Sequence, residues 1–222
     1  MNYKKNSMRY EKKYIIRKNE LFRIKHLIKN NDLFFKPIFY PRFINSIYFD
    51  NENLELYKQN INGLRNRTKF RVRWYSDNEY SNLEVKIKNG FLGTKEIYPL
   101  GPILNKNKEI SFQKIDNRIS KLQKDMNSNI FLSFLKPTLF VSYKRSYFLS
   151  KIIDCRLTLD EEIKYYKIEN KHININPRKT LNYIVELKYP SDLDNLELNI
   201  FSKFPFRYSK YSKYVSGMQF FI

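Results

Sequence analysis

Apolar and polar residues alternate along most of this chain, the pattern of β-strands that have one apolar face. Residues 66–75 are the clearest case, because Phe70, Val72 and Trp74 alternate there with lysine and arginine. The same alternation predicts strands over residues 8–17, 45–50, 59–62, 66–75, 82–87, 94–98, 138–148, 156–165 and 183–188. The chain should therefore fold mainly as β-structure.

Apolar residues also recur at helical spacing in four shorter stretches. Leu21, Ile24 and Ile28 form one stripe, and Asn19 before it suits a helix N-cap. The other stripes are Ile115, Ile119, Leu122 and Met126; Leu193, Leu196 and Ile200; and Tyr211, Tyr214, Val215 and Met218. We expect these few helices to cover a sheet.

Two asparagine-glycine pairs, Asn62-Gly63 and Asn89-Gly90, predict tight hairpin turns. The polar stretches at residues 105–109 and 170–179 predict surface loops. Because hairpins join antiparallel neighbours, the sheet should be largely antiparallel. We therefore expect an α+β fold, a closed antiparallel β-barrel with a few covering helices, formed by residues 1–222 as a single domain.

The chain is strongly basic, with 42 Lys and Arg residues against 22 Asp and Glu residues and a formal net charge of +20. Aromatic residues make up 17% of it, which argues for a packed core and against disorder. This charge implies an anionic partner, which could be a nucleic acid, an acidic membrane surface or a small polyphosphate.

Cys155 is the only cysteine, which excludes an internal disulfide and a cysteine-rich zinc site and is typical of a reducing compartment. No apolar stretch approaches the roughly 18 residues of a membrane-spanning helix, and none resembles a secretory leader. We therefore expect a cytoplasmic protein, at most peripheral at the inner face of a membrane.

The basic residues follow the strand alternation and gather on one face. Alternation puts Arg67, Lys69, Arg71 and Arg73 on the same side of residues 66–75. A sheet with one face in water would explain such a row on a single strand. Like charges opposite one another destabilise a sheet, however, and here they dominate strand after strand. Phosphates bound inside a barrel would neutralise this face.

Carboxylates are the minority on these charged faces, and they are Glu11, Glu84, Asp160 and Glu186. Triphosphate chemistry needs a divalent cation held by oxygen ligands, so each carboxylate is a candidate metal ligand. An ion pair within the basic face is the alternative for each, and it weighs equally for all but Glu186.

A series of short motifs runs through the chain in a definite order. They are Arg9-Tyr10-Glu11-Lys12-Lys13-Tyr14; Ser46-Ile47-Tyr48-Phe49-Asp50; Gly63 followed by Arg67, Lys69, Arg71, Arg73 and Tyr75; Leu83-Glu84-Val85-Lys86; Tyr143-Lys144-Arg145; Arg156-Leu157-Thr158-Leu159-Asp160; Val185-Glu186-Leu187-Lys188; and Ser212-Lys213-Tyr214. In this order they resemble the VTC domain, and the resemblance spans nearly the whole chain.

The resemblance implies a triphosphate tunnel, a barrel whose lumen binds a nucleoside triphosphate with Mn²⁺ or Mg²⁺. VTC enzymes transfer the γ-phosphoryl group of ATP to a growing inorganic polyphosphate chain and release ADP. Carried over to this sequence, the catalytic, phosphate-binding cations are Lys13, Arg71, Arg73, Lys86, Lys95, Arg145, Arg156 and Lys213, and the metal ligand is Glu186. Four further residues of the charged faces are candidates for cofactor binding: Arg67, Lys69, Glu11 and Lys188.

Lys210 is the alternative to Lys213, because a Ser-Lys-Tyr triplet surrounds each of them; Val215 and Gly217 follow Lys213 as in the family. Expected partners are ATP and inorganic polyphosphate, together with a membrane protein for export, because the sequence shows no transmembrane segments like those of eukaryotic relatives.

Two other functions stay open. A tunnel-type triphosphatase would use water as the acceptor, but hydrolytic relatives typically begin with Glu-x-Glu-x-Lys, whereas here Glu11 alone precedes Lys13. A non-enzymatic polyanion- or RNA-binding protein would explain the pI near 9.8 and the interleaved aromatic residues. The sequence has no recognised nucleic-acid-binding motif, so we expect no nucleic acid partner.

Overall fold

The computed structural model describes residues 9–75, 80–90, 92–125, 134–190 and 206–222. Its strands are β1 (Arg9–Ile16), β2 (Lys36–Asp50), β3 (Asn66–Tyr75), β4 (Tyr80–Asn89), β5 (Leu92–Pro102), β6 (Lys136–Leu149), β7 (Arg156–Glu169), β8 (His172–Ile173), β9 (Arg178–Lys179) and β10 (Tyr183–Pro190). Its helices are the 3-10 helix η1 (Lys18–Glu20) and the α-helices α1 (Leu21–Lys29), α2 (Glu55–Ile61), α3 (Phe112–Asp125) and α4 (Lys213–Met218).

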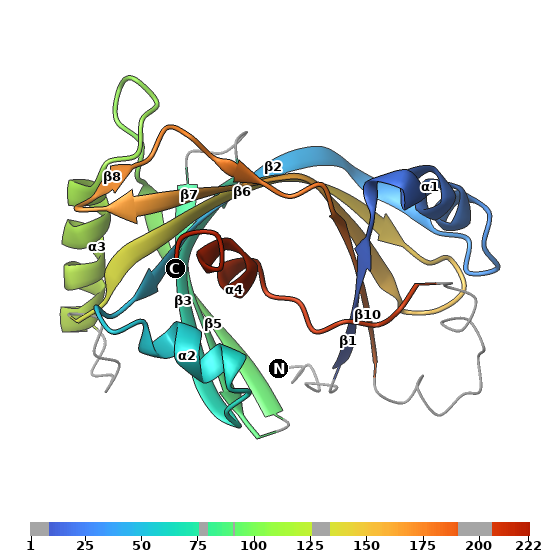
Figure 1. Ribbon diagram of the computed structural model, residues 1–222, viewed down its shortest axis with the longest axis horizontal. Helices are drawn as coiled ribbons and strands as arrows, with labels where there is room; N and C mark the ends of the chain where they lie inside the picture. Colours follow the sequence, from blue (N-terminus) through green and yellow to red (C-terminus); the bar gives the residue numbers. More distant parts are fainter. Residues whose placement is uncertain (1–8, 76–79, 91, 126–133, 191–205) are drawn as a thin grey trace, which may run out of the picture. The chain divides into compact units, whose positions relative to one another are not determined.

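The strands form one sheet in the order β1-β10-β7-β6-β2-β3-β4-β5, and β8 and β9 pair with β7 (Figure 1). The registers of β1 with β10, β10 with β7, and β2 to β5 with one another are antiparallel. The antiparallel α+β fold predicted from the sequence is thus confirmed. The pairings in the described part of the chain do not join β1 to β5, so closure of the barrel stays a prediction.

Contacts divide the chain into two compact units. Unit 1 comprises Met1–Arg42, Tyr143–Ile163 and Thr180–Tyr211, and unit 2 comprises Phe43–Ser142, Lys164–Lys179 and Ser212–Ile222. Strands β2, β6 and β7 contribute residues to both units. Each unit has its own apolar core, and the single domain predicted from the sequence stays a prediction.

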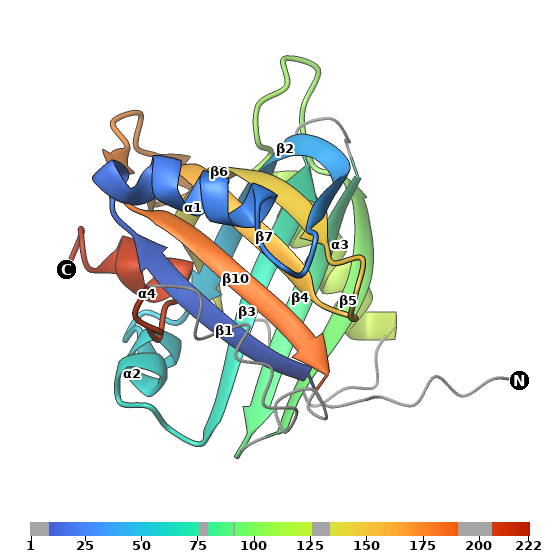
Figure 2. The ribbon, with the colours of Figure 1, turned by 90° about the vertical axis from the view of Figure 1, so that its right-hand side faces the viewer.

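In unit 1 the strands β1 and β10 run side by side in opposite directions (Figure 2). Their apolar residues, such as Tyr14 and Val185, share a buried core with Ile24 and Ile28 of α1. The predicted apolar stripe of this helix is therefore confirmed, although its N-cap is Glu20 at the end of η1 and not Asn19. Cys155 is buried in the same core, and burial raises the pKa of its thiol to about 12, so this residue is a packing residue.

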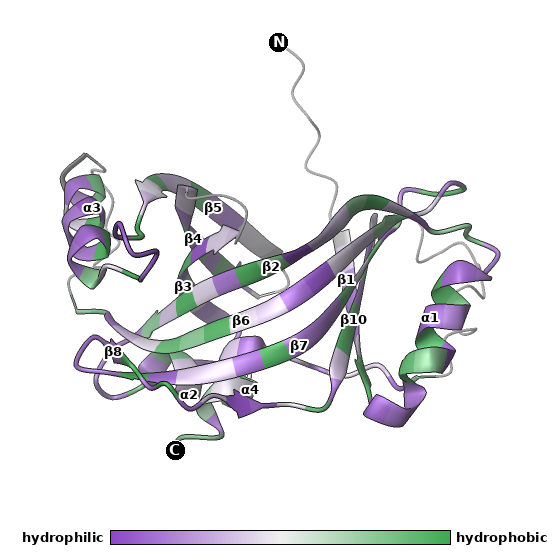
Figure 3. Ribbon diagram, turned by 90° about the horizontal axis from the view of Figure 1, so that it is seen from above, coloured by the Kyte–Doolittle hydropathy of each residue, from purple (hydrophilic) through white to green (hydrophobic). Residues whose placement is uncertain are grey.

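In unit 2 the strands β3, β4 and β5 lie side by side (Figure 2). Phe70, Val72 and Trp74 of β3 are buried in the core of this unit. Helix α3 packs Ile115 into this core. Both α1 and α3 carry hydrophobic and hydrophilic residues in alternating bands, as expected for helices that cover a sheet with one side (Figure 3). In unit 2, α2 and α4 contact each other (Figure 1).

Three local predictions were wrong. Residues 59–62 lie mostly in α2 and form no strand, so Asn62-Gly63 ends a helix and makes no hairpin. Gly63 adopts a positive φ of 66°, a conformation that helix ends use as readily as hairpins do. Residues 170–179 are not all loop, because β8 and β9 within them pair with β7.

Of the other local predictions, one hairpin is confirmed, one strand starts earlier than predicted, and one helix lies outside the described residues. Asn89-Gly90 does form the hairpin between β4 and β5, with Gly90 at a φ of 59°. Strand β2 begins at Lys36, nine residues before the predicted start at Asn45, in a stretch that contains Pro37 and Pro41. The predicted helix with Leu193, Leu196 and Ile200 lies outside the described residues. None of the helices that the structure describes is long and apolar enough to cross a membrane.

Candidate active site

The strand registers of unit 2 place polar side chains of neighbouring strands on one face. Arg71 of β3 lies opposite Glu84 of β4, and Lys69 lies opposite Lys86. Lys86 in turn lies opposite Lys95 of β5. The charged face predicted from alternation is thus confirmed for these strands, and it is the face opposite the core residues Phe70, Val72 and Trp74.

Glu84 is the centre of this face. Its Oε2 accepts hydrogen bonds from Nε of Arg71 at 2.6 Å and lies 2.5 Å from Nη2 of the same arginine. The same oxygen is 3.7 Å from Nη1 of Arg73, and Oε1 accepts a bond from Nζ of Lys95 at 2.8 Å. One buried carboxylate therefore brings three predicted phosphate-binding cations together, in the ion pairs that the sequence left open as one alternative for Glu84.

These cations decide the ionisation of Glu84. Burial alone would raise the pKa of its carboxyl, but the charges of Arg71 and Arg73 and the bond from Lys95 lower the pKa from 4.5 to about 2. The carboxylate consequently stays charged in the folded protein at every pH at which the unfolded chain would also ionise it.

The shift predicts how folding stability depends on pH. Because the pKa of Glu84 is lower in the folded protein than in the unfolded chain, its ionised carboxylate stabilises the fold. This contribution is complete above about pH 4.5 and is lost as the pH falls towards about 2. At 1.36 kcal/mol per unit of pKa, the loss attributable to Glu84 is about 3 kcal/mol. Urea unfolding at a series of pH values should show this loss, and Glu84→Gln should show a shallower decline over the same interval. Equal slopes for the two proteins would contradict the assignment.

The adjoining strand β2 completes the polar face with residues that sequence reasoning gave no role. Ser46 lies opposite Arg73 and accepts a hydrogen bond from its Nε at 3.2 Å. Tyr48 lies opposite Arg71 and accepts a bond from its Nη1 at 3.3 Å. The alternation of polar Ser46 and Tyr48 with apolar neighbours was a visible signal in the sequence. The arginines that they meet could be identified only from the strand register.

The C-terminal segment of unit 2 brings Lys213 to this polar face. Ser212 caps α4, since its hydroxyl accepts a bond from the backbone N–H of Val215, and it also receives a bond from Nζ of Lys69 at 3.0 Å. Lys213 is the first residue of α4, and its charge contributes to the lowered pKa of Tyr48. Lys210, the alternative residue, belongs to unit 1 and is exposed.

Unit 1 holds a second cluster, in which two lysines and two glutamates of β1 and β10 meet. Lys13 lies opposite Glu186 and Glu11 lies opposite Lys188 in the register. Nζ of Lys13 forms an ion pair with Glu11 and lies 3.5 Å from Glu186, while Nζ of Lys188 is 2.8 Å from Glu186 and 3.8 Å from Glu11. Four predicted site residues therefore form one compact network.

The charges of this network shift the pKa values of Lys13 and Glu186. Burial would lower the pKa of Lys13, but Glu186 and Glu11 together raise it. Burial would likewise raise the pKa of Glu186, yet Lys188, Lys13 and Arg145 hold it well below its usual range. Lys13 and Glu186 are thus both charged at neutral pH.

Arg145 of β6 and Asp160 of β7 form a bidentate ion pair in unit 1. Nε of Arg145 donates to Oδ1 at 2.5 Å and Nη2 donates to Oδ2 at 2.7 Å. Asp160 is only 1% exposed, so its carboxylate depends on this partner. Asp160 is therefore the counter-ion of a predicted phosphate-binding arginine, which is the ion-pair alternative that the sequence left open for it.

Three predicted cations lie at the margins of these clusters. Lys86 and Arg156 are exposed, the latter opposite Lys188 in the register of β10 with β7. Nη1 of Arg67 donates to the backbone oxygen of Leu64 at 2.8 Å, near the start of β3.

A divalent metal would find a partial set of ligands in unit 1. Among the described residues no group of three or more histidine, cysteine, aspartate or glutamate side chains could hold an ion alone. Glu186 and Glu11 nevertheless share the same two lysines. Mg²⁺ is commonly held by one or two carboxylates together with substrate phosphates and water. The two carboxylates fit such an ion, provided that phosphate oxygens complete its coordination.

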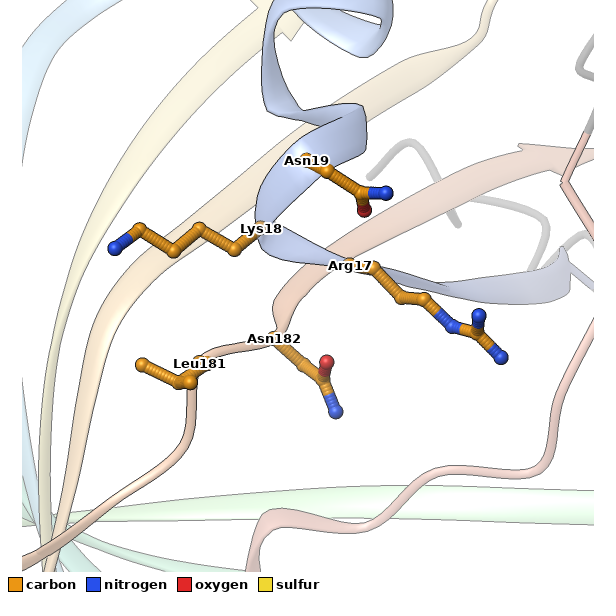
Figure 4. A pocket seen from close by; sticks show the side chains of 5 residues that line it. All are labelled: Arg17, Lys18, Asn19, Leu181 and Asn182. Carbon is orange, nitrogen blue, oxygen red and sulfur yellow. The ribbon is translucent and has the colours of Figure 1, made fainter.

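A separate surface depression lies in unit 1, where the chain leaves β1 and enters β10 (Figure 4). Arg17, Lys18, Asn19, Leu181 and Asn182 line it. It contains none of the residues of the two charged clusters, so it adds nothing to the candidate site.

Several solved structures share this fold. A proposed adenylate cyclase from Bacillus halodurans is 15% identical, with a TM-score of 0.52 over 97% of this chain and 98% of that chain. A second one, from Vibrio parahaemolyticus, is 12% identical, with a TM-score of 0.54 over 96% and 98%. A third, from Hippeastrum, is described as revealing a dominant triphosphatase activity; it is 12% identical, with a TM-score of 0.50 over 96% and 97%.

No curated protein matches the sequence. The sequence profile of the VTC domain does match, over residues 8–222, which include both charged clusters. This match and the shared fold support an enzyme that acts on triphosphates. The resemblance inferred from the order of the motifs is confirmed, and the chain belongs to the VTC domain family.

Proposed function

We propose that this protein is a polyphosphate polymerase, which transfers the γ-phosphoryl group of ATP to a growing inorganic polyphosphate chain with the help of Mn²⁺ or Mg²⁺. Family membership supports this reaction. The observation that carries it is the gathering of Arg71, Arg73 and Lys95 around Glu84 on one strand face. The closed barrel predicted from the sequence is part of the same proposal.

The chemistry needs no nucleophile from the protein. A terminal oxygen of the polyphosphate chain attacks the γ-phosphorus, a new P–O bond forms, and the bond to the β–γ bridging oxygen breaks. ADP leaves with that electron pair. Positioning and neutralisation of phosphate charge supply most of the catalysis in such transfers. Arginine forks suit this task because each can contact two phosphate oxygens at once.

Each cluster contributes cations to this task. In unit 2, Arg71 and Arg73 bind phosphate oxygens, with Lys95, Lys86 and Lys213 as further positive charges. In unit 1, Lys13, Arg145 and Arg156 do the same. Glu186, with Glu11, would hold the divalent metal, which when bound neutralises phosphate charge and orients the phosphates.

A triphosphatase is the second candidate. The Hippeastrum structure, with its described triphosphatase activity, favours it. Against it stands the small number of carboxylates: among the described residues only Glu11 and Glu186 meet at Lys13, and both are engaged with lysines. Transfer to phosphate therefore remains the better-supported reaction.

One incubation separates the two candidates. Purified protein with ATP and either Mn²⁺ or Mg²⁺ should yield ADP and a phosphate polymer that can be sized by gel electrophoresis and degraded by an exopolyphosphatase. Neither product should form without added metal. Free phosphate in place of polymer would support the triphosphatase and overturn the polymerase proposal. An Arg71→Gln/Arg73→Gln protein purified in parallel controls for contaminating enzymes.

A further inference from the structure

Tyr48 is an aromatic residue on the charged face of unit 2. It lies on β2 directly opposite Arg71, while its neighbours Ile47 and Phe49 face the core. The side chain is almost fully buried. Packing in the core would not require a hydroxyl group at this position, and the hydroxyl of Tyr48 lies among charged side chains.

The hydroxyl of Tyr48 has a hydrogen left to donate. It accepts one hydrogen bond, from Nη1 of Arg71 at 3.3 Å. A phenol can also donate one, and a buried hydroxyl normally does so. Within the described part of the chain, no acceptor for this hydrogen is found. The arginine, which has no acceptor atom of its own, cannot take it.

The ring of Tyr48 is held in place by a network that contains no phosphate-binding residue. It stacks on Tyr214 of α4, with ring centroids 5.3 Å apart and 19° between the planes. The hydroxyl of Tyr214 donates to Oδ2 of Asp50 at 2.5 Å. Asp50 also accepts bonds from the backbone N–H groups of Leu56 and Tyr57 at the start of α2. The position of the Tyr48 hydroxyl oxygen is therefore fixed before any ligand arrives.

The surroundings of this hydroxyl favour an anion. The guanidinium group of Arg71 lies over the Tyr48 ring at 5.9 Å from its centroid, and Arg73 and Lys213 also act on the phenol electrostatically. Three positive charges around one hydrogen-bond donor make a poor site for a neutral acceptor and a good one for a phosphate oxygen.

We propose that Tyr48 is a substrate-binding residue, whose hydroxyl donates a hydrogen bond to an oxygen of the phosphate chain that Arg71 and Arg73 also bind. This inference rests on the proposed function, because it names a further contact to the same substrate. Tyr214 and Asp50 are positioning residues, which act through Tyr48 and through α4.

The test is Tyr48→Phe, which keeps the ring and its stacking on Tyr214 and removes only the hydroxyl. A hydrogen bond to a charged group predicts that the affinity for tripolyphosphate, measured by calorimetry without metal, falls about tenfold or more. The melting temperature without ligand should change little. Tyr57→Phe is the matched control, since Tyr57 packs edge-on against Tyr214 from α2 and should bind tripolyphosphate as the unmodified protein does.

A double-mutant cycle measures whether two substitutions affect the affinity for tripolyphosphate independently, and a purely structural role of Tyr48 would predict no coupling with Lys213. If Tyr48 and Lys213 serve one phosphate chain, Tyr48→Phe combined with Lys213→Gln should lose less affinity than the product of the two single losses. Unchanged affinity for tripolyphosphate in Tyr48→Phe would overturn the inference. A loss of affinity accompanied by a marked fall in the melting temperature of the ligand-free protein would overturn it as well, because the hydroxyl would then have a structural role. Failure of the unmodified protein to bind any phosphate chain would overturn the proposed function as well, so the two failures can be told apart.

Discussion

Replacing Arg71 and Arg73 together with glutamine should lower the rate of polyphosphate formation from ATP by at least about 10³-fold. Removing one preorganised donor to a developing charge typically costs 10² to 10³ in rate, and this variant removes two. Both arginines also touch the same carboxylate oxygen of Glu84, so they act on one small region of the strand face. The measurement is the initial rate of ADP release, with polymer sized on gels.

The same variant should also lose stability, and this loss has to be separated from the loss of catalysis. Without the two arginines, Glu84 would be a buried carboxylate with Lys95 as its remaining ion-pair partner among those in the described chain. Adding Glu84→Gln removes the stranded charge and should restore most of the free energy of unfolding. The triple variant should nevertheless remain inactive. A stable triple variant that makes polymer at the normal rate would refute the role of both arginines.

The two clusters show why so many like charges can share a strand face. In unit 2, one glutamate forms ion pairs with three cations, and in unit 1 two glutamates and an aspartate form ion pairs with Lys13, Lys188 and Arg145. These carboxylates stabilise the protein before substrate binds. A phosphate chain must then bind at cations that already have carboxylate partners, so it competes with those carboxylates for the N–H donors of the arginines.

The strands and their faces were predictable because they depend on local alternation. Strand β3 begins and ends where the sequence predicted, since its basic and apolar residues alternate without interruption. Strand β2 was predicted too short, because its first half contains Pro37 and Pro41 and has no alternation of burial. Asn62-Gly63 was misassigned because a positive φ is required by a hairpin and by a helix end alike.

The partners of the site residues were not predictable, because they depend on register between strands far apart in the sequence. Alternation placed Glu84 among basic residues but could not choose between an ion pair and a metal ligand. It also left Tyr48 without a role, since nothing local connects it to Arg71, which lies opposite it on β3. Family resemblance supplied most of the candidate cations, and the strand registers supplied their counter-ions.

Changing Arg145 to methionine should lower the free energy of unfolding by about 3 to 5 kcal/mol, the usual cost of stranding one partner of a buried ion pair. Asp160 would be that stranded partner, because it is 1% exposed and both of its oxygens bond to the guanidinium. Urea unfolding at neutral pH measures the effect. As a control, Lys171→Met breaks the exposed pair with Asp116 and should change stability little.

The combined variant Arg145→Met/Asp160→Leu separates the structural role of Arg145 from its predicted contact with phosphate. Replacing both ions by apolar side chains of similar size is often neutral for stability, so the double variant should regain most of what the single variant loses. It should not regain polymer synthesis, because Arg145 would still be missing from the phosphate-binding cations. A double variant that recovered both stability and activity would leave Arg145 with a structural role alone, since its only necessary partner would then be Asp160.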